Sequence, residues 1–194
     1  MKAKIVGLKR LRTGLSLTFE IAAPTGRRRL SCRPSLEAYE RAGAPALNET
    51  VSEEAYLLLA EKEEWAAAEE RAVQILSAGD NSCRALLQKL LARGFLRESA
   101  ASAVSRLVEA GYLDEEAMLS RQFSIYAKKR IGMAKILPSL LQKGFSREAI
   151  LAAAASAEAE GDYSPATIKA ALLAENASLS PEEKKKLLKK HGFS

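Results

Sequence analysis

The chain has 194 residues, of which 47% are apolar and 28% are charged, and it carries a formal net charge of +6. This composition supplies a hydrophobic core and excludes an intrinsically disordered tail. No segment approaches the roughly 20 uninterrupted apolar residues of a membrane-spanning helix, and no apolar signal region follows Lys2 and Lys4. We therefore expect a cytoplasmic protein with no membrane contact.

Residues that often carry metal or nucleotide chemistry are scarce. Cys32 and Cys83 are the only cysteines and His191 is the only histidine, and their spacing fits neither a zinc site nor a disulfide framework. The glycines form none of the spaced runs that bind nucleotide phosphates. We expect no catalytic residue, no metal and no cofactor, and therefore not an enzyme.

Charge is unevenly distributed along the chain. Residues 1–50 have a net charge of +6, residues 51–80 of −6 and residues 81–150 of +6, whereas residues 151–194 are balanced. This pattern fits a basic working face that meets an acidic partner, either a nucleic acid or an acidic protein surface. A set of solvated helix faces is the alternative interpretation.

Residues 1–50 are predicted to form a small β-rich extension. Between Leu15 and Ile21 the apolar side chains fall at every second position, which is typical of a strand with one buried face. Turns at residues 12–14 and 24–26 would pair this strand with one neighbour on either side. Because three strands alone are marginally stable, we expect this antiparallel β-meander to dock on the helices that follow.

From residue 51 onward the pattern is helical. Residues 51–80 form acidic linking helices, in which Ser52 is predicted to cap the first turn and a break could fall between Glu61 and Glu64. Further helix starts are predicted from capping residues that precede proline or acidic side chains, at Asp114, Ser164 and Ser180.

An internal repeat organises the rest of the chain. A gap-free shift of 50 residues superimposes identical residues, for example Leu87 on Leu137 and Gly94 on Gly144. Each unit has the pattern of three short helices, and the first helix ends at a glycine that can adopt a left-handed conformation. We predict a three-helix repeat at 81–130, a second at 131–179 and a truncated third at 180–194. The predicted fold class is mainly α, with tandem three-helix repeats in an elongated stack behind the β-meander.

The repeats also carry a family resemblance. Four segments in this order resemble the RecX family of recombinase regulators: LLQKLLARGF at 86–95, GYLDEE at 111–116, KKRIG at 128–132 and LLQKGF at 140–145. The resemblance implies a curved protein of tandem three-helix repeats that binds the RecA recombinase and its filament on single-stranded DNA. It further implies restraint of recombinase and coprotease activity in DNA repair and the SOS response. The β-rich N-terminus is similar to an extension that some members carry.

Two basic clusters are candidate binding sites. The first lies at the junction of the two full repeats and comprises Tyr126, Lys128, Lys129, Arg130 and Lys135. We predict that it binds the partner, with its cations facing an acidic surface and the tyrosine stacking on a base or filling a pocket. In the alternative interpretation the cations stabilise helix C-terminal carbonyls and the tyrosine belongs to the core.

The second cluster is the run Arg27, Arg28 and Arg29, which follows a tight turn. We predict that these arginines bind nucleic acid at the tip of a hairpin. A solvated edge strand, whose charges prevent strand pairing between molecules, is the open alternative.

Together these observations predict a monomeric regulatory protein that binds a RecA-type recombinase and its single-stranded DNA filament. Two other functions are open. Short helices joined by a glycine turn also fit a direct DNA-binding protein of the helix-turn-helix type, and the repeats could form a noncatalytic helical interaction scaffold. Residues 96–110 contain mainly alanine and serine with two arginines, which argues against base readout.

Overall fold

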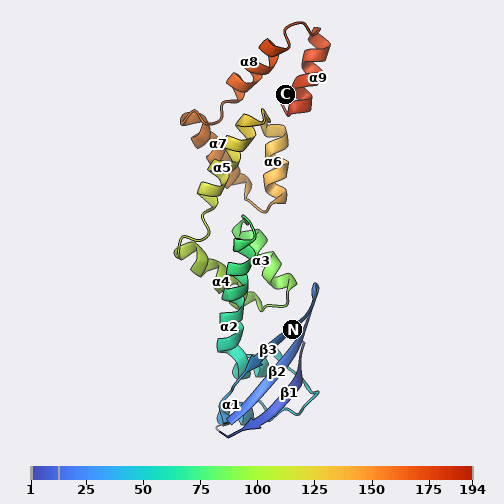
Figure 1. The fold of residues 1–194 in the computed structure, drawn as a ribbon, viewed down its shortest axis with the longest axis vertical. Helices are drawn as coiled ribbons and strands as arrows, with labels where there is room; N and C mark the ends of the chain where they lie inside the picture. The colour runs from blue at the N-terminus through green and yellow to red at the C-terminus, as the bar shows by residue number, and fades with distance from the viewer. Residues whose placement is uncertain (1, 13, 194) are drawn as a thin grey trace. The chain divides into compact units, whose positions relative to one another are not determined.

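The computed structural model describes residues 2–12 and 14–193 (Figure 1). In this part of the chain the protein is mainly helical with a small N-terminal antiparallel sheet, which confirms that aspect of the predicted fold class. Contacts divide the chain into two compact units, residues 1–79 with 85–112 and residues 80–84 with 113–194. The division between the units falls inside the predicted repeat 81–130, and the predicted domain limits stay a prediction. The turn predicted at 12–14 includes Thr13, which lies outside the described residues.

The secondary-structure elements have the following bounds. The strands are β1 (Ala3–Leu11), β2 (Gly14–Ala23), β3 (Gly26–Cys32) and β4 (Thr50–Val51). The helices are α1 (Leu36–Arg41), α2 (Glu53–Ser77), α3 (Cys83–Ala92), α4 (Arg97–Glu109), α5 (Glu115–Lys128), α6 (Met133–Gln142), α7 (Arg147–Ala159), α8 (Pro165–Glu175) and α9 (Pro181–His191). Over the described residues, none of these helices combines the length and the apolar composition needed to cross a bilayer.

The sheet has the strand order β3-β2-β1-β4, with antiparallel pairing throughout. Its first three strands form the predicted meander. Phe19 of β2 pairs with Ile5 of β1 on one side and with Leu30 of β3 on the other. Phe19 and Ile21 are fully buried, which confirms the alternation predicted for β2. The sequence did not predict β4, because a strand of two residues is too short to show an alternating pattern.

The sheet packs against the first part of α2 in unit 1. Tyr56 of α2 meets Phe19 edge-on, with ring centroids 5.0 Å apart and planes at 80°. Ser52 caps this helix as predicted, because its side chain accepts a hydrogen bond from the backbone of Ala55. At Ala60 the backbone leaves the helical region, with a φ of −140°, so α2 bends just before the segment where a break was expected. After this kink, α2 packs against α4.

In unit 2, α5 packs against α7, and Phe123 of α5 contacts Tyr163 with ring centroids 5.3 Å apart. The Tyr163 hydroxyl donates a hydrogen bond of 3.1 Å to the carbonyl of Ile131, so this buried tyrosine also fixes the segment between α5 and α6. The caps predicted for α5, α8 and α9 are confirmed in each case by a side-chain hydrogen bond: Asp114, Ser164 and Ser180.

The first helix of each predicted repeat ends in the same way. Gly94, Gly144 and Gly192 have φ values of 80°, 91° and 85°, the left-handed conformation expected at these helix ends. The phenylalanine that follows each glycine folds back, and its side chain is buried. Its backbone N–H donates to a leucine carbonyl of the last turn: Phe95 to Leu90, Phe145 to Leu140 and Phe193 to Leu188.

Residues from other segments cap these helix ends. In unit 1, the backbone N–H and the hydroxyl of Thr25 donate to the carbonyl of Ala92, at 3.1 and 2.8 Å. In unit 2, the Ser82 hydroxyl donates to the carbonyl of Lys143 at 2.9 Å, and the Gly132 N–H donates to that of His191 at 2.8 Å. Ser82 and Gly132 are related by the shift of 50 residues, so equivalent positions make equivalent contacts within unit 2.

Candidate functional site

The first candidate site is the junction between α5 and α6. Helix α5 ends at Lys128, Lys129 follows as its C-cap, and Arg130 turns the chain with a φ of 55°. Few residues other than glycine adopt this left-handed conformation, and where they do the surrounding contacts determine it. Here the N–H of Ile131 donates to the carbonyl of Tyr126 at 3.0 Å and closes the turn.

Arg130 is fixed by both its side chain and its backbone. Its guanidinium contacts both carboxylate oxygens of Glu175 at the end of α8, with Nη2 donating to Oε1 at 2.6 Å. These hydrogen bonds lower the pKa of Glu175 and raise the pKa of Arg130. The Arg130 carbonyl lies 2.9 Å from Nδ1 of His191, which must be the donor because a carbonyl only accepts. Arg130 therefore organises the junction.

The three lysines of the cluster are exposed. Over the described residues, the side-chain ammonium groups of Lys128, Lys129 and Lys135 have no hydrogen-bond or ion-pair partner. Lys128 and Lys129 lie at the C-terminal end of α5, where a cation interacts favourably with the helix dipole. Lys135 lies in the first turn of α6, where the same dipole disfavours a cation, so helix stabilisation does not account for it.

Tyr126 has a different environment from the lysines. It is half-buried on α5, and its hydroxyl lies 3.3 Å from the Ser139 hydroxyl of α6. The structure therefore places this tyrosine between the two helices, where it connects them.

The end of α9 docks on the same junction. Besides the bond from Gly132 to His191, the N–H of Ala134 donates to the carbonyl of Gly192 at 3.2 Å. The approach is close, because a Cβ atom on Gly132 would lie 2.3 Å from the Gly192 carbonyl oxygen. This contact brings the last turn of α9 to the junction, and its lysines are exposed: Lys189 and Lys190. The sequence pattern did not reveal this, since nothing in the repeat marked Gly132 as a contact point.

The second candidate site, the arginine run on β3, is divided by the structure. Arg28 points inward, and its side chain is only 12% exposed, whereas the side chains of Arg27 and Arg29 are 76% and 70% exposed. The Arg28 guanidinium donates to Glu64 at 2.6 Å and lies over the Phe95 ring, 4.1 Å from its centroid. The Arg28 side chain therefore contributes to packing inside unit 1, and nucleic-acid binding by the arginine run stays a prediction.

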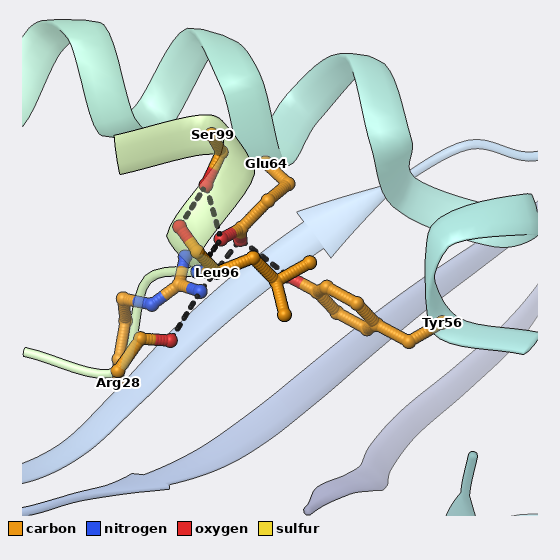
Figure 2. A network of polar contacts seen from close by, with 6 residues as sticks. Arg28, Tyr56, Glu64, Leu96 and Ser99 are labelled. Atoms are coloured by element: carbon orange, nitrogen blue, oxygen red, sulfur yellow. Dashed lines mark hydrogen bonds and ion pairs between the residues drawn. The ribbon is translucent and has the colours of Figure 1, made fainter. Parts of the chain in front are cut away.

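Glu64 is the centre of this buried network (Figure 2). Its carboxylate is fully buried and accepts four hydrogen bonds, from the Arg28 guanidinium, the Tyr56 hydroxyl, the Leu96 backbone N–H and the Ser99 hydroxyl. Burial and the adjacent Glu64 carboxylate raise the pKa of Tyr56, so its hydroxyl stays a donor. The network joins β3, α2 and the start of α4, and a carboxylate with every oxygen occupied is well suited to a buried position.

Arg27 and Arg29 share one carboxylate, that of Glu20 on β2. Arg27 Nη1 lies 2.8 Å from Glu20 and Arg29 Nη2 lies 3.3 Å away. Partial burial acts to raise the pKa of Glu20, but the hydrogen bonds and charges of the two arginines outweigh it and leave the pKa lowered. One carboxylate cannot neutralise two guanidinium groups, so this edge of the sheet keeps a net positive charge.

The two cysteines are poor nucleophiles. Burial and the negative charge of a nearby glutamate raise the pKa of Cys32 to about 12 and that of Cys83 to about 11. Over residues 2–12 and 14–193, no group of three or more histidine, cysteine, aspartate or glutamate side chains is placed to hold a metal ion. The candidate binding surfaces are therefore the two basic ones, at the α5–α6 junction and on β3.

Comparisons with known proteins add to this geometry. No protein-family model matches the chain. The regulatory protein RecX of Stenotrophomonas maltophilia (strain R551-3) is 34% identical over 94 residues, which cover 48% of this chain and 56% of that protein. The crystal structure of a regulatory protein RecX matches with a TM-score of 0.55 and 15% identity, covering 99% of this chain and 95% of the other. Both comparisons thus lead to proteins named RecX.

The two RecX comparisons carry different information. The sequence match spans just over half the length of the curated RecX protein, whereas the structural match extends over nearly all of both chains and shows the fold. Both proteins are named as regulatory proteins, and neither name describes an enzyme.

Within this RecX fold, the structure treats the two predicted clusters differently. It keeps Tyr126, Arg130 and the three lysines on one junction and adds the end of α9 to it. It separates Arg28 from Arg27 and Arg29, which lie on the opposite face of β3.

Proposed function

We propose that this chain regulates a RecA-type recombinase by binding its filament on single-stranded DNA and restraining strand exchange and coprotease activity. The similarity to regulatory proteins named RecX supports the regulatory part of this proposal. The observation that carries the binding part is a group of exposed lysines at the α5–α6 junction whose ammonium groups pair with none of the described residues: Lys128, Lys129 and Lys135.

The physical argument is electrostatic. A cation that is not neutralised within its own protein keeps its full attraction for an acidic protein surface or a DNA phosphate. Binding of such cations to a nucleoprotein filament releases condensed counterions, which favours association at low salt. Lys189 and Lys190 on the docked end of α9 add to the positive charge at the same junction.

The test is a strand-exchange assay with a variant in which Lys128, Lys129 and Lys135 are each replaced by glutamate. Exposed substitutions of this kind typically change folding stability by about 0.5 kcal/mol or less each, so the variant is expected to fold. Inhibition of strand exchange is expected to weaken by about tenfold or more, most clearly at low salt.

A matched control carries the same change in charge elsewhere. Lys62, Arg97 and Arg147 are also exposed, and replacing these three by glutamate is expected to leave inhibition unchanged. Equal inhibition by the junction variant and the wild type, with unchanged circular dichroism, would show that the junction lysines do not contribute to binding. Equal loss in both variants would show that only net charge matters.

A further inference from the structure

A pocket in unit 1 has a chemistry that the proposed recombinase contact does not use. Its cavity volume is about 460 Å³, within the range of about 300–1,000 Å³ typical of small-ligand sites. Three segments line it: the turn between β2 and β3, the second half of α2, and the loop that follows α3. Four arginines and one acidic residue contribute to the lining: Arg27, Arg28, Arg71, Arg93 and Glu70.

The arginines of this pocket differ in their partners. Arg28 is paired with Glu64, and Arg27 shares Glu20 with Arg29. Arg71 donates to the Gln74 side chain at 2.7 Å, and Arg93 donates to the Lys89 carbonyl at 2.8 Å.

Arg71 and Arg93 thus differ from the other two in lacking a carboxylate partner. Among the described residues, neither forms an ion pair. A guanidinium has five N–H donors, so each of these arginines retains donors for a ligand.

The segments that carry these arginines are joined by specific contacts. Thr25 makes two hydrogen bonds to the end of α3, and a Cβ on Gly94 would lie 2.8 Å from the Ala23 Cβ, so the turn and the helix end are in close contact. The buried pair of Arg28 and Glu64 joins the same strand to α2. Because the three segments that carry these arginines are joined to one another, the backbone positions of the cations are set before a ligand arrives, which reduces the entropy cost of binding.

The lining indicates which ligand fits. The only aromatic residue of the pocket, Phe95, is 7% exposed and is covered by the Arg28 guanidinium, so it offers no free face for a nucleobase. The exposed donors are guanidinium groups, whose planar fork matches the oxygens of a phosphate. Such a site recognises charge and phosphate geometry, without reading base sequence.

We propose that this pocket binds a backbone phosphate of single-stranded nucleic acid, with Arg71 and Arg93 as the principal donors and Arg27 as a supporting cation. The inference extends the proposed function, because a protein that acts on a recombinase filament meets single-stranded DNA, but its test requires no recombinase. It also reassigns the nucleic-acid contact predicted on β3: Arg27 stays, Arg28 belongs to the fold, and two arginines distant in sequence take part.

The test measures binding of fluorescent single-stranded oligothymidylate to the full chain by anisotropy over a range of salt concentrations. The variant Arg71→Glu/Arg93→Glu is expected to bind about tenfold more weakly at low salt. The slope of log affinity against log salt is expected to decrease in magnitude by about 0.7 for each phosphate that the variant no longer binds. Because Arg93 also contacts the end of α3, the milder variant Arg71→Gln/Arg93→Gln tests the same donors with less perturbation and is expected to weaken binding in the same direction.

The control variant Arg41→Glu/Arg97→Glu has the same change in charge on exposed residues outside the pocket, and its affinity and slope are expected to match the wild type. The proposal is overturned if both pocket variants fold and keep wild-type affinity and slope. It is also overturned if polyglutamate displaces the oligonucleotide at equal concentration of charged groups, because the site would then respond to negative charge alone. The proposed function can fail separately: wild-type protein that binds oligothymidylate through the pocket without inhibiting strand exchange would contradict only that function.

Discussion

Each unit contains an arginine–glutamate ion pair that joins elements distant in sequence, and the two pairs differ in burial. In unit 1 the side chains of Arg28 and Glu64 are 12% and 0% exposed, and the carboxylate accepts hydrogen bonds from four groups. In unit 2 the side chains of Arg130 and Glu175 are 40% and 54% exposed. The same pair of residue types therefore holds a core together in one unit and lies at a candidate binding surface in the other.

This difference shows why residue type alone does not assign a role to an arginine. Removing one partner of a buried pair leaves an uncompensated charge in a medium that solvates it poorly, whereas water solvates the remaining partner of an exposed pair. Substitutions in the buried pair of unit 1 should therefore act on folding, and substitutions at the junction in unit 2 should act mainly on binding.

The largest effect is expected for Arg28→Ala. It removes the charge that balances fully buried Glu64, and we expect the free energy of unfolding to decrease by about 3–5 kcal/mol. Urea denaturation followed by circular dichroism measures this decrease. Arg29→Ala is the control, because its side chain is exposed on the same strand and should change stability little. Similar decreases in both variants would show that the Glu64 network is not the anchor of unit 1.

A smaller effect is expected for Gly132→Ala, which tests whether α9 holds the junction in unit 2. The added Cβ would lie 2.3 Å from the Gly192 carbonyl oxygen, so α9 must shift, at a cost of about 1–3 kcal/mol. Faster hydrogen exchange at Ala134 and in the last turn of α9 is the expected observation. Gly161→Ala is the control, since a Cβ there meets nothing within 4 Å and only its φ of 82° is strained. Unchanged exchange in α9 would contradict the docking of α9 on the α5–α6 junction.

The two cysteines give a third comparison between the units. Relative to an ordinary thiol pKa of about 8.5, a pKa of about 11 for Cys83 lowers its thiolate fraction near neutral pH by at least about 100-fold. Alkylation at pH 8 is expected to be slow in the folded protein and fast in urea, with Cys32 slower than Cys83 because Cys32 is fully buried. The raised pKa contributes stability that is complete below the unfolded-state pKa and is lost as the pH rises toward 11. Rapid native labelling of Cys32 would contradict the packing of unit 1.

The smallest effect is expected for breaking the exposed pair, with Arg130→Ala and Glu175→Ala measured singly and together. Hydrogen bonds from Arg130 lower the pKa of Glu175, so the contribution of the pair is present above the unfolded-state pKa of a glutamate. It is lost as the pH falls through the lowered folded-state pKa. A double-mutant cycle by thermal unfolding is expected to show a small coupling that salt removes. A coupling of several kcal/mol, as expected for a buried pair, would contradict the conclusion that exposure makes the Arg130–Glu175 pair weak.

Much of the fold could be predicted from local sequence patterns. The alternation around Phe19, the capping residues of α5, α8 and α9, and the glycine at the end of each first helix each depend on neighbours close in sequence, and each was found as predicted. The two-residue strand β4 and the contact of Gly132 with α9 depend on segments distant in sequence, and neither leaves a local pattern.

The division of the arginine run was predictable in part. A strand places alternate side chains on opposite faces, so Arg28 shares a face with Leu30 and Cys32, the buried side of β3, whereas its neighbours point the other way. That alternation predicts an inward arginine. The alternation does not identify Glu64 as the partner of Arg28, because the acidic helix α2 offers several carboxylates. The kink at Ala60 and the packing of α4 place the Glu64 carboxylate at this position.

The central claim, that the lysines of the α5–α6 junction contact a recombinase filament, is tested most directly by equilibrium binding to a preformed filament of recombinase on single-stranded DNA. The labelled chain is titrated by anisotropy at low salt, beside the variant with Lys128, Lys129 and Lys135 replaced by glutamate. We expect saturable binding by the wild type and at least about tenfold weaker binding by the variant, while both retain the same helical signal. Wild-type protein that does not bind the filament, or a folded variant that binds it equally well, would contradict the claim.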